Sequence, residues 1–171
     1  RRVLVIDDNA LLGAVLRELI DAIDGFRVIA VAKDGEEGLR MVHQLDPDIV
    51  TLDIEMPGVD GIAALGYIMS ELPRPVVMVS AATTRGTVDL TIRALELGAV
   101  DFVRKPSGTT MTAWAGTRRR IEEALPAAIV CAAAFSAMAV FWGDVGMALF
   151  LPAATAYFVV ATIGRAILRN H

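Results

Sequence analysis

The sequence predicts an α/β fold with a doubly wound, five-stranded parallel sheet, followed by a hydrophobic α-helical hairpin. Three observations lead to this prediction. Five short apolar runs alternate with stretches whose apolar residues recur at helical spacing, as in repeated βαβ units. The runs are almost continuously apolar, interrupted only by Thr51 and Asp101, which is typical of parallel strands buried on both faces. Finally, residues 124–142 and 145–164 are two uncharged runs, each about long enough to cross a bilayer as a helix.

The expected elements follow one another in a regular order. The strands are the apolar runs at residues 3–6, 28–31, 49–52, 76–79 and 100–103. The helices lie between them, with apolar stripes over about residues 11–23, 38–45, 62–72 and 88–95. Asn9 is placed to cap the first helix, and Gly98 stops the fourth. Because crossovers between parallel strands are right-handed, helices are expected on both faces of the sheet.

Polar residues stand where the apolar strands end. These residues are Asp7 and Asp8, Asp53, Ser80 and Lys105. The carboxyl ends of parallel strands meet at one edge of a sheet, and ligands bind there. Three carboxylates in one cleft repel each other unless a cation is present, and Mg²⁺ is the most natural choice for oxygen ligands. With a lysine for phosphate oxygens and a hydroxyl donor, the set predicts phosphoryl transfer to an aspartate.

Four segments resemble the response-regulator receiver family. They are VLVIDD at residues 3–8, LDIEMPGVDG at 52–61, VVMVS at 76–80 and FVRKP at 102–106. More narrowly, DIEMP at 53–57 together with RALELGAVDFV at 93–103 is similar to the receiver of chemotaxis protein-glutamate methylesterases. The resemblance covers about 107 residues, and it implies a flavodoxin-like receiver that is phosphorylated by a histidine kinase.

The resemblance implies roles for the acidic residues by their position. Asp53 would be the phosphoacceptor and also a ligand of Mg²⁺. Asp8 would bind the metal directly, Asp7 largely through water, and the backbone carbonyl of Glu55 would be a further ligand. The implied cofactor is therefore Mg²⁺, held by oxygen atoms alone.

The resemblance also implies how the phosphoryl group would be sensed. Lys105 would pair with that group, and Ser80 would supply the switch hydroxyl that follows it. Phe102 sits at the aromatic switch position, whose ring is expected to move inward upon activation. The output would be a change at the surface around the fourth helix, the fifth strand and Phe102.

The sequence divides into three parts. Residues 1–107 are the expected receiver domain, 108–123 a basic linker or partial fifth helix, and 124–168 a two-helix, membrane-spanning hairpin. Arg118, Arg119 and Arg120 precede the first run, while Arg165 and Arg169 follow the second. The positive-inside rule then predicts a cytoplasmic receiver, with both ends cytoplasmic at the bacterial inner membrane. The alternative is a buried helical hairpin in a soluble protein or in a homo-oligomer.

The predicted function is a two-component signalling switch tethered to the membrane. No separate catalytic domain is expected, so the chain would support only its own aspartyl phosphorylation and dephosphorylation. The net charge of -4 gives no argument for nucleic-acid binding. Two alternatives stay open: the regulatory fragment of a chemotaxis methylesterase without its catalytic domain, or an artificial fusion of a receiver to a small membrane protein near residues 107–111.

Overall fold

The computed structural model describes residues 1–81, 86–106 and 113–134. Its elements are β1 (Arg2–Ile6), α1 (Ala10–Asp21), β2 (Arg27–Ala32), α2 (Gly35–Leu45), β3 (Ile49–Leu52), α3 (Gly61–Glu71), β4 (Val76–Ser80), α4 (Gly86–Glu96) and β5 (Asp101–Arg104). A further helix over residues 113–134, called the C-terminal helix below, follows β5. The five strands and four helices predicted from the apolar runs are confirmed.

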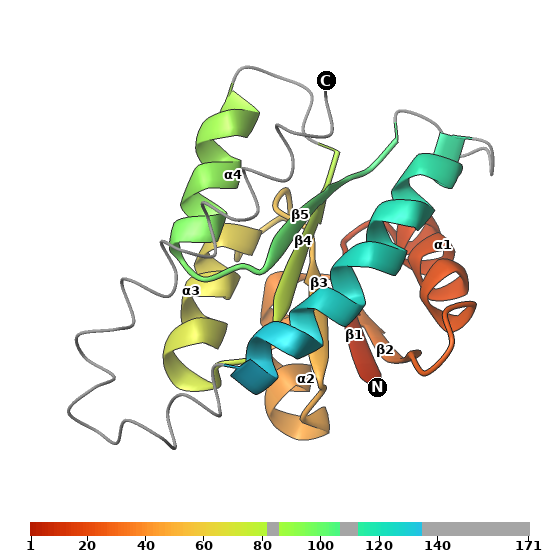
Figure 1. Cartoon of the computed structure of the whole chain (residues 1–171). Helices are drawn as coiled ribbons and strands as arrows, with labels where there is room; N and C mark the ends of the chain where they lie inside the picture. Colours follow the sequence, from red (N-terminus) through yellow and green to blue (C-terminus); the bar gives the residue numbers. More distant parts are fainter. Residues whose placement is uncertain (82–85, 107–112, 135–171) are drawn as a thin grey trace.

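The five strands form one parallel sheet in the order β2-β1-β3-β4-β5 (Figure 1). The chain moves outward from β1 to β2 and then returns to β3 on the other side of β1. Strand order therefore reverses between β1 and β3, and a ligand site is expected where these two strands end. Asp7 follows β1 and Asp53 follows β3, and the amide of Asp53 still donates to the carbonyl oxygen of Ile6 at 2.9 Å. Their side chains are thus placed at that point by the sheet itself.

Helices cover both faces of the sheet, as predicted. In Figure 1, α1 and the C-terminal helix lie on one face, and α2, α3 and α4 lie on the other. Each face has its own buried cluster, because a strand directs alternate side chains to opposite sides. Val3 and Val5 of β1 belong to the first cluster, and Leu4 and Ile6 of the same strand belong to the second.

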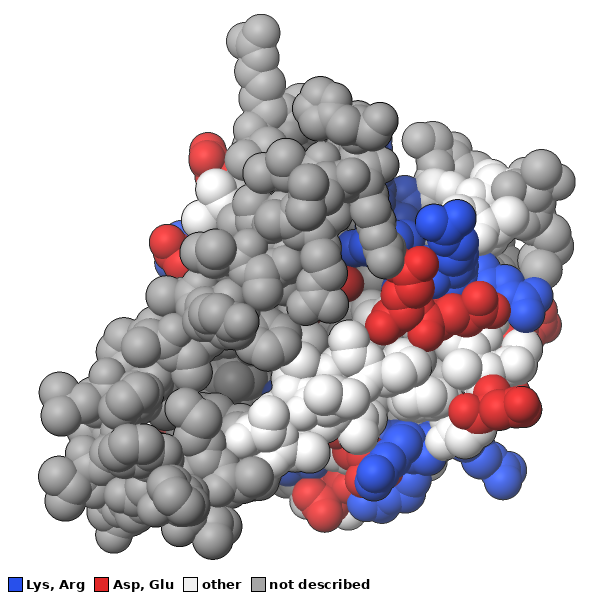
Figure 2. All heavy atoms as spheres, in the orientation of Figure 1, with Lys and Arg blue, Asp and Glu red and all other residues white. Residues whose placement is uncertain are grey.

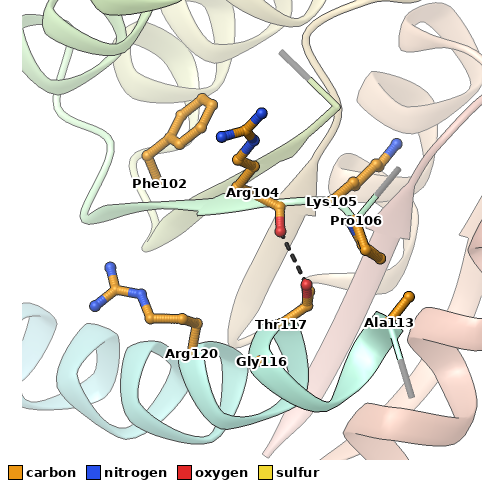
Figure 3. A pocket seen from close by; sticks show the side chains of 8 residues that line it. All are labelled: Phe102, Arg104, Lys105, Pro106, Ala113, Gly116, Thr117 and Arg120. Carbon is orange, nitrogen blue, oxygen red and sulfur yellow. Dashed lines mark hydrogen bonds between the residues drawn. The ribbon is translucent and has the colours of Figure 1, made fainter. Parts of the chain in front are cut away.

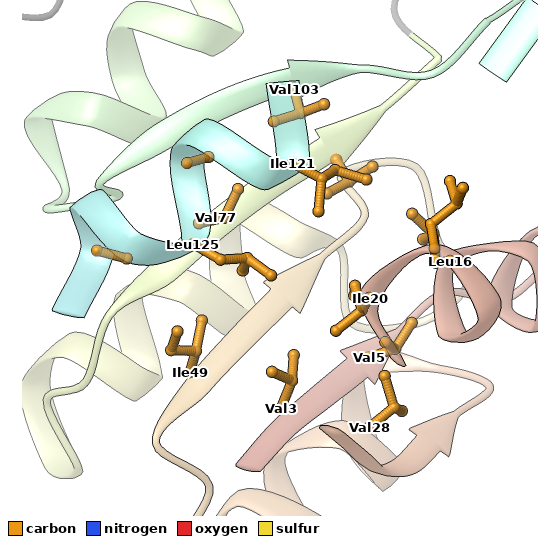
Figure 4. Packing of buried hydrophobic residues seen from close by; sticks show 14 of the residues in the cluster. Val3, Val5, Leu16, Ile20, Val28, Ile49, Val77, Val103, Ile121 and Leu125 are labelled. Carbon is orange, nitrogen blue, oxygen red and sulfur yellow. The ribbon is translucent and has the colours of Figure 1, made fainter. Parts of the chain in front are cut away.

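The C-terminal helix is an integral part of the first cluster. Trp114, Ile121 and Leu125 are 0%, 1% and 0% exposed, and they belong to one cluster with Val3, Ile20 and Val77. Figure 4 shows Ile121 and Leu125 beside the strand residues. Ala124 and Ala128 are also buried there. The helix runs without a break across the predicted boundary between residues 123 and 124. The start of the first uncharged run therefore packs against the sheet of the receiver.

The rest of the predicted hairpin, residues 135–168, lies outside the described residues. Within residues 1–81, 86–106 and 113–134, no helix has both the length and the apolar character needed to cross a membrane. The membrane attachment, the position of both ends in the cytoplasm and the oligomer through the hairpin stay predictions.

The C-terminal helix runs antiparallel to β5. The Thr117 hydroxyl donates to the Arg104 carbonyl oxygen at 3.0 Å, and Arg120, one turn later, pairs with Asp101 at the start of the strand at 3.3 Å. Because the carboxyl end of β5 lies next to the site, the far end of this antiparallel helix lies at the amino ends of the strands (Figure 1). Charged side chains gather over its first half, whereas the exposed second half carries none (Figure 2).

Candidate functional site

Three buried charged side chains meet at the carboxyl ends of β1, β3 and β5. The ammonium of Lys105 lies 2.6 Å from Oδ2 of Asp7 and donates to Oδ2 of Asp53 at 2.7 Å. Asp7, Asp53 and Lys105 are 2%, 6% and 3% exposed. A single lysine thus bridges two carboxylates that would otherwise repel each other in a poorly solvated site.

Backbone amides hold the second oxygen of each carboxylate. The amide of Asn9 donates to Oδ1 of Asp7 at 3.0 Å, and the amide of Ile54 donates to Oδ1 of Asp53 at 2.7 Å. The Asn9 side chain in turn accepts from the first turn of α1, as its predicted capping role requires. Both carboxylates are therefore fixed from two sides before any ligand binds.

Asp8 completes a group of acidic side chains that fits a metal ion. One carboxylate oxygen each from Asp7, Asp8 and Asp53 lies within 4.8 Å of the others, and Asp8 is exposed. All the donors are oxygens, which suits a hard divalent cation such as Mg²⁺. The structure brings the predicted ligands together. The exposed Glu55 lies two residues after Asp53, and the role of its backbone carbonyl stays a prediction.

Burial raises the pKa of the Asp7 carboxyl above its ordinary value. The largest cause is the loss of water around the charged form, and the negative charge of Asp53 adds to it. The hydrogen bond and positive charge of Lys105 act in the opposite direction, as does the amide of Asn9. The charged form of Asp7 is therefore disfavoured in the metal-free site, and a bound cation would favour it.

This raised pKa predicts a pH dependence of stability for the metal-free protein. A carboxyl whose pKa is higher in the folded state binds its proton more tightly there, so its contribution is fully present below the unfolded pKa. That contribution is lost as the pH rises from about 3.8 through the raised value. Asp7→Asn should remove this dependence and raise the melting temperature at pH 7 without Mg²⁺. Thermal unfolding with and without Mg²⁺ measures this, and an unchanged or lower melting temperature would contradict it.

Ser80 and Phe102, the two predicted switch residues, occupy different environments. Ser80 is 1% exposed, and within the described residues its hydroxyl makes no hydrogen bond. Its carbonyl oxygen accepts from the amide of Lys105 at 2.9 Å, which ties the ends of β4 and β5 together. Phe102 is half-buried against the second core cluster. Ser80 thus has an unused hydroxyl donor within the described residues, and Phe102 is only partly buried.

A groove of about 450 Å³ lies between β5 and the C-terminal helix. Phe102 and Arg104 line it from the strand, and Gly116, Thr117 and Arg120 line it from the helix (Figure 3). The hydrogen bond from Thr117 to the Arg104 carbonyl joins the two sides. Phe102 therefore belongs to the lining of an open surface groove as well as to the packing of the sheet.

Gly61, at the start of α3, is a site residue to which the sequence analysis gave no role. A Cβ atom there would lie 1.9 Å from the backbone oxygen of Asp53 and 2.7 Å from Cα of Ile54. The amide of Gly61 also donates to the carbonyl oxygen of Ile54 at 2.9 Å. The loop that carries Asp53 can pack this closely only against a glycine. The sequence signal was the second glycine of LDIEMPGVDG.

Comparison with known proteins agrees with this geometry. Residues 3–113 match the response regulator receiver domain family. The chain is 56% identical over 108 residues to a protein-glutamate methylesterase/protein-glutamine glutaminase of Symbiobacterium thermophilum, covering 63% of the chain and 30% of that protein. It is 52% identical over 103 residues to such a protein from Nitratidesulfovibrio vulgaris, covering 60% of the chain and 28% of that protein. The chain thus spans about 30% of the length of these curated relatives.

Solved structures show the same likeness. The response regulator domain of Thermotoga maritima CheB has a TM-score of 0.68 and 41% identity, over 75% of this chain and 95% of that one. A CheX-CheY-BeF3-Mg complex from Borrelia burgdorferi matches with a TM-score of 0.59 and 34% identity, over 71% of this chain and 87% of that one. The strand ends, the acidic cluster and the comparisons therefore lead to one family.

Proposed function

The chain belongs to the response regulator receiver family, and on that premise we propose that it is a signalling switch that accepts a phosphoryl group on Asp53 from a histidine kinase. The observation that carries the proposal is the bridge from Lys105 to both Asp7 and Asp53, beside an acidic group that fits Mg²⁺. When bound by Asp7, Asp8 and Asp53, Mg²⁺ would neutralise charge on the phosphoryl oxygens.

The residues of the chain have distinct tasks in this reaction. A carboxylate oxygen of Asp53 forms the bond to phosphorus while the bond from phosphorus to the imidazole nitrogen of the phosphohistidine breaks, and the released imidazole takes up a proton. The amide of Ile54 and the ammonium of Lys105 orient the Asp53 carboxylate beforehand. After transfer, Lys105 can donate to a phosphoryl oxygen and keep its contact with Asp7.

The switch residues would report the new group to the surface. The Ser80 hydroxyl, which makes no hydrogen bond within the described part of the chain, is a donor for a phosphoryl oxygen. Movement of Ser80 and Lys105 would also move Phe102, because β4 and β5 are paired strands. Their register runs from Val77 opposite Asp101 to Ser80 opposite Arg104. The proposed output is a change in the burial of Phe102, which lines the groove beside β5.

The test is the binding of beryllofluoride, a phosphoryl mimic, with and without Mg²⁺. Binding should require Mg²⁺ and should be lost in Asp53→Ala, because the mimic must coordinate to the carboxylate oxygen of Asp53. Asp24→Asn, at an exposed aspartate away from the site, is the matched control and should bind normally. Uptake of phosphate from acetyl phosphate should show the same pattern. Equal binding by Asp53→Ala and the parent chain would sink the assignment.

A second candidate is a regulatory piece related to chemotaxis methylesterases. It is favoured by the identity of 44–56% to curated proteins of that name over about 108 residues, each matched over about 30% of its length or less. On this reading the chain would regulate a methylesterase domain and would not hydrolyse methylated glutamate by itself. Release of methanol from a methylated receptor by the purified chain would contradict that reading. A cytoplasmic location stays a prediction of the sequence.

A further inference from the structure

The second half of the C-terminal helix has an exposed face without any charge. This face consists of Pro126, Ala127, Val130, Ala133 and Ala134, and Val130 is 67% exposed. It is called the outer face below. The opposite side of the same turns is buried in the receiver core through Ala124, Leu125 and Ala128. The receiver itself therefore covers one side of these turns and leaves the other side open.

The first half of the same helix is built differently on its solvent side. Arg118 pairs with Glu122 at 2.7 Å, and Arg119 pairs with Glu123 at 3.4 Å, so charged side chains meet the water there. From residue 124 to residue 134 the helix carries no charged residue at all. A helix that is apolar on all sides is normally buried on all sides. The outer face thus has the composition of an interface.

The chain itself supplies a segment that can cover this face. Thirty-seven residues follow Ala134, and they include the uncharged run at 145–164 after the polar break at Gly143 and Asp144. Residues 135–144 can reach about 33 Å when extended, enough to turn and come back along the helix. A segment joined by so short a connection is present at an effective concentration in the millimolar range. A separate partner of equal affinity would have to reach a similar concentration to compete for the outer face.

A bilayer is less suited than the tail to cover the outer face, because part of the first uncharged run is already buried in the receiver core. With Ala124, Leu125 and Ala128 in the core, only residues 129–142 are left for the first arm of a membrane hairpin. As a helix these residues are about 21 Å long, and the hydrocarbon layer is about 30 Å thick. A hairpin that crosses twice would have to pull these side chains out of the receiver.

We propose that residues 145–164 fold back onto the outer face of the C-terminal helix, so that this helix is packed between the receiver and the chain's own apolar tail. The occupant is this segment of the same chain. The inference is independent of phosphorylation, since the second half of the helix lies toward the amino ends of the strands and Asp53 lies at their carboxyl ends.

The first test measures how fast single cysteines react with a maleimide in the full chain without detergent. In a Cys131→Ser background, Val130→Cys reports on the outer face, and Ala115→Cys is the matched control on the solvent side of the first half. If the tail covers the outer face, Val130→Cys should react about tenfold more slowly than Ala115→Cys, because reaction then requires local opening. Equal rates overturn the proposal. Circular dichroism melts confirm that each variant folds.

The second test identifies what covers the face. Val130→Cys is combined with one cysteine at a time over residues 150–157, and a bismaleimide joins pairs that lie close together. The proposal expects cross-linked monomers at every third or fourth position, at a yield that does not depend on protein concentration. Cross-linked dimers would assign the face to a second copy. Protection only in phosphatidylglycerol vesicles would assign it to a membrane, and protection without any cross-link would exclude the tail. Each of these three results overturns the proposal.

Discussion

Ending the chain after Ser107 is expected to unfold the receiver domain. This position is the boundary that the sequence predicted, yet the truncation removes Trp114, Ile121 and Leu125, which are at most 1% exposed in the core. Loss of three such side chains costs on the order of 10 kcal/mol, and a whole domain is stable by only about 5–15 kcal/mol. Circular dichroism during heating should show no cooperative transition.

A stop after Ala134 is the matched control for this truncation. It keeps every described residue of the C-terminal helix, including Ala124 and Ala128, and removes only residues 135–171. This shorter chain should melt cooperatively and should still bind beryllofluoride with Mg²⁺. If the chain that ends at Ser107 melts at the same temperature as this control, the C-terminal helix does not belong to the receiver core.

Gly61→Ala is expected to damage both the stability of the protein and its uptake of phosphoryl groups. The added Cβ would lie 1.9 Å from the backbone oxygen of Asp53, so the loop that carries the phosphoacceptor has to move. Steric overlap with the backbone should cost about 3 kcal/mol. Misplacing Asp53 by about 1 Å should slow phosphorylation by acetyl phosphate about 100-fold. Urea unfolding and phosphorylation kinetics measure the two effects separately.

Gly66→Ala, on the same helix, is the control for this substitution. A Cβ at Gly66 meets no atom within 4 Å. Alanine inside a helix is favoured over glycine by about 1 kcal/mol, so this variant should be slightly more stable and should be phosphorylated normally. Equal effects of the two substitutions would mean that the contact between Gly61 and Asp53 does not matter.

The alternation of apolar runs and helical stripes was enough to predict the doubly wound parallel sheet, and the motifs at the strand ends pointed to the receiver family. The run at residues 49–52 has only one polar residue, Thr51, and all four of its residues are buried in β3. Asn9 and Gly98 act where they were predicted, at the beginning of α1 and just after α4. Local signals and tertiary burial agree in this part of the chain, so little was left for long-range contacts to decide.

The members of the site could be predicted, but their geometry could not. The strand ends placed Asp7, Asp53 and Lys105 at one edge, and the structure brings them together there. The sequence did not indicate that one ammonium would bridge both carboxylates, because that depends on the register between strands far apart in the chain. Gly61 was missed for a related reason. Its role is to let the backbone of Asp53 and Ile54 approach closely, and that approach depends on tertiary structure and not on a local sequence pattern.

The place of the C-terminal helix in the receiver core could not be predicted, because hydropathy does not say which neighbour buries a residue. Ala124, Leu125 and Ala128 are apolar whether they face lipid or a sheet, and only the tertiary structure places them against the receiver. The three arginines before them were read as charges that flank a membrane. In the structure Arg118, Arg119 and Arg120 each pair with a carboxylate, so the cluster is largely neutralised.

The antiparallel course of the C-terminal helix has a consequence for how the protein can be approached. The helix spans residues 113–134, and at about 1.5 Å per residue its two ends lie about 33 Å apart. Its first residue, Ala113, lines the same groove as Lys105. The contacts of Thr117 with Arg104 and of Arg120 with Asp101 show that the helix runs from there toward the amino ends of the strands. A partner that binds the described end of this helix, near Ala134, would therefore contact the protein on the side away from Asp53. Such a partner need not compete for surface with a kinase that docks over Asp53.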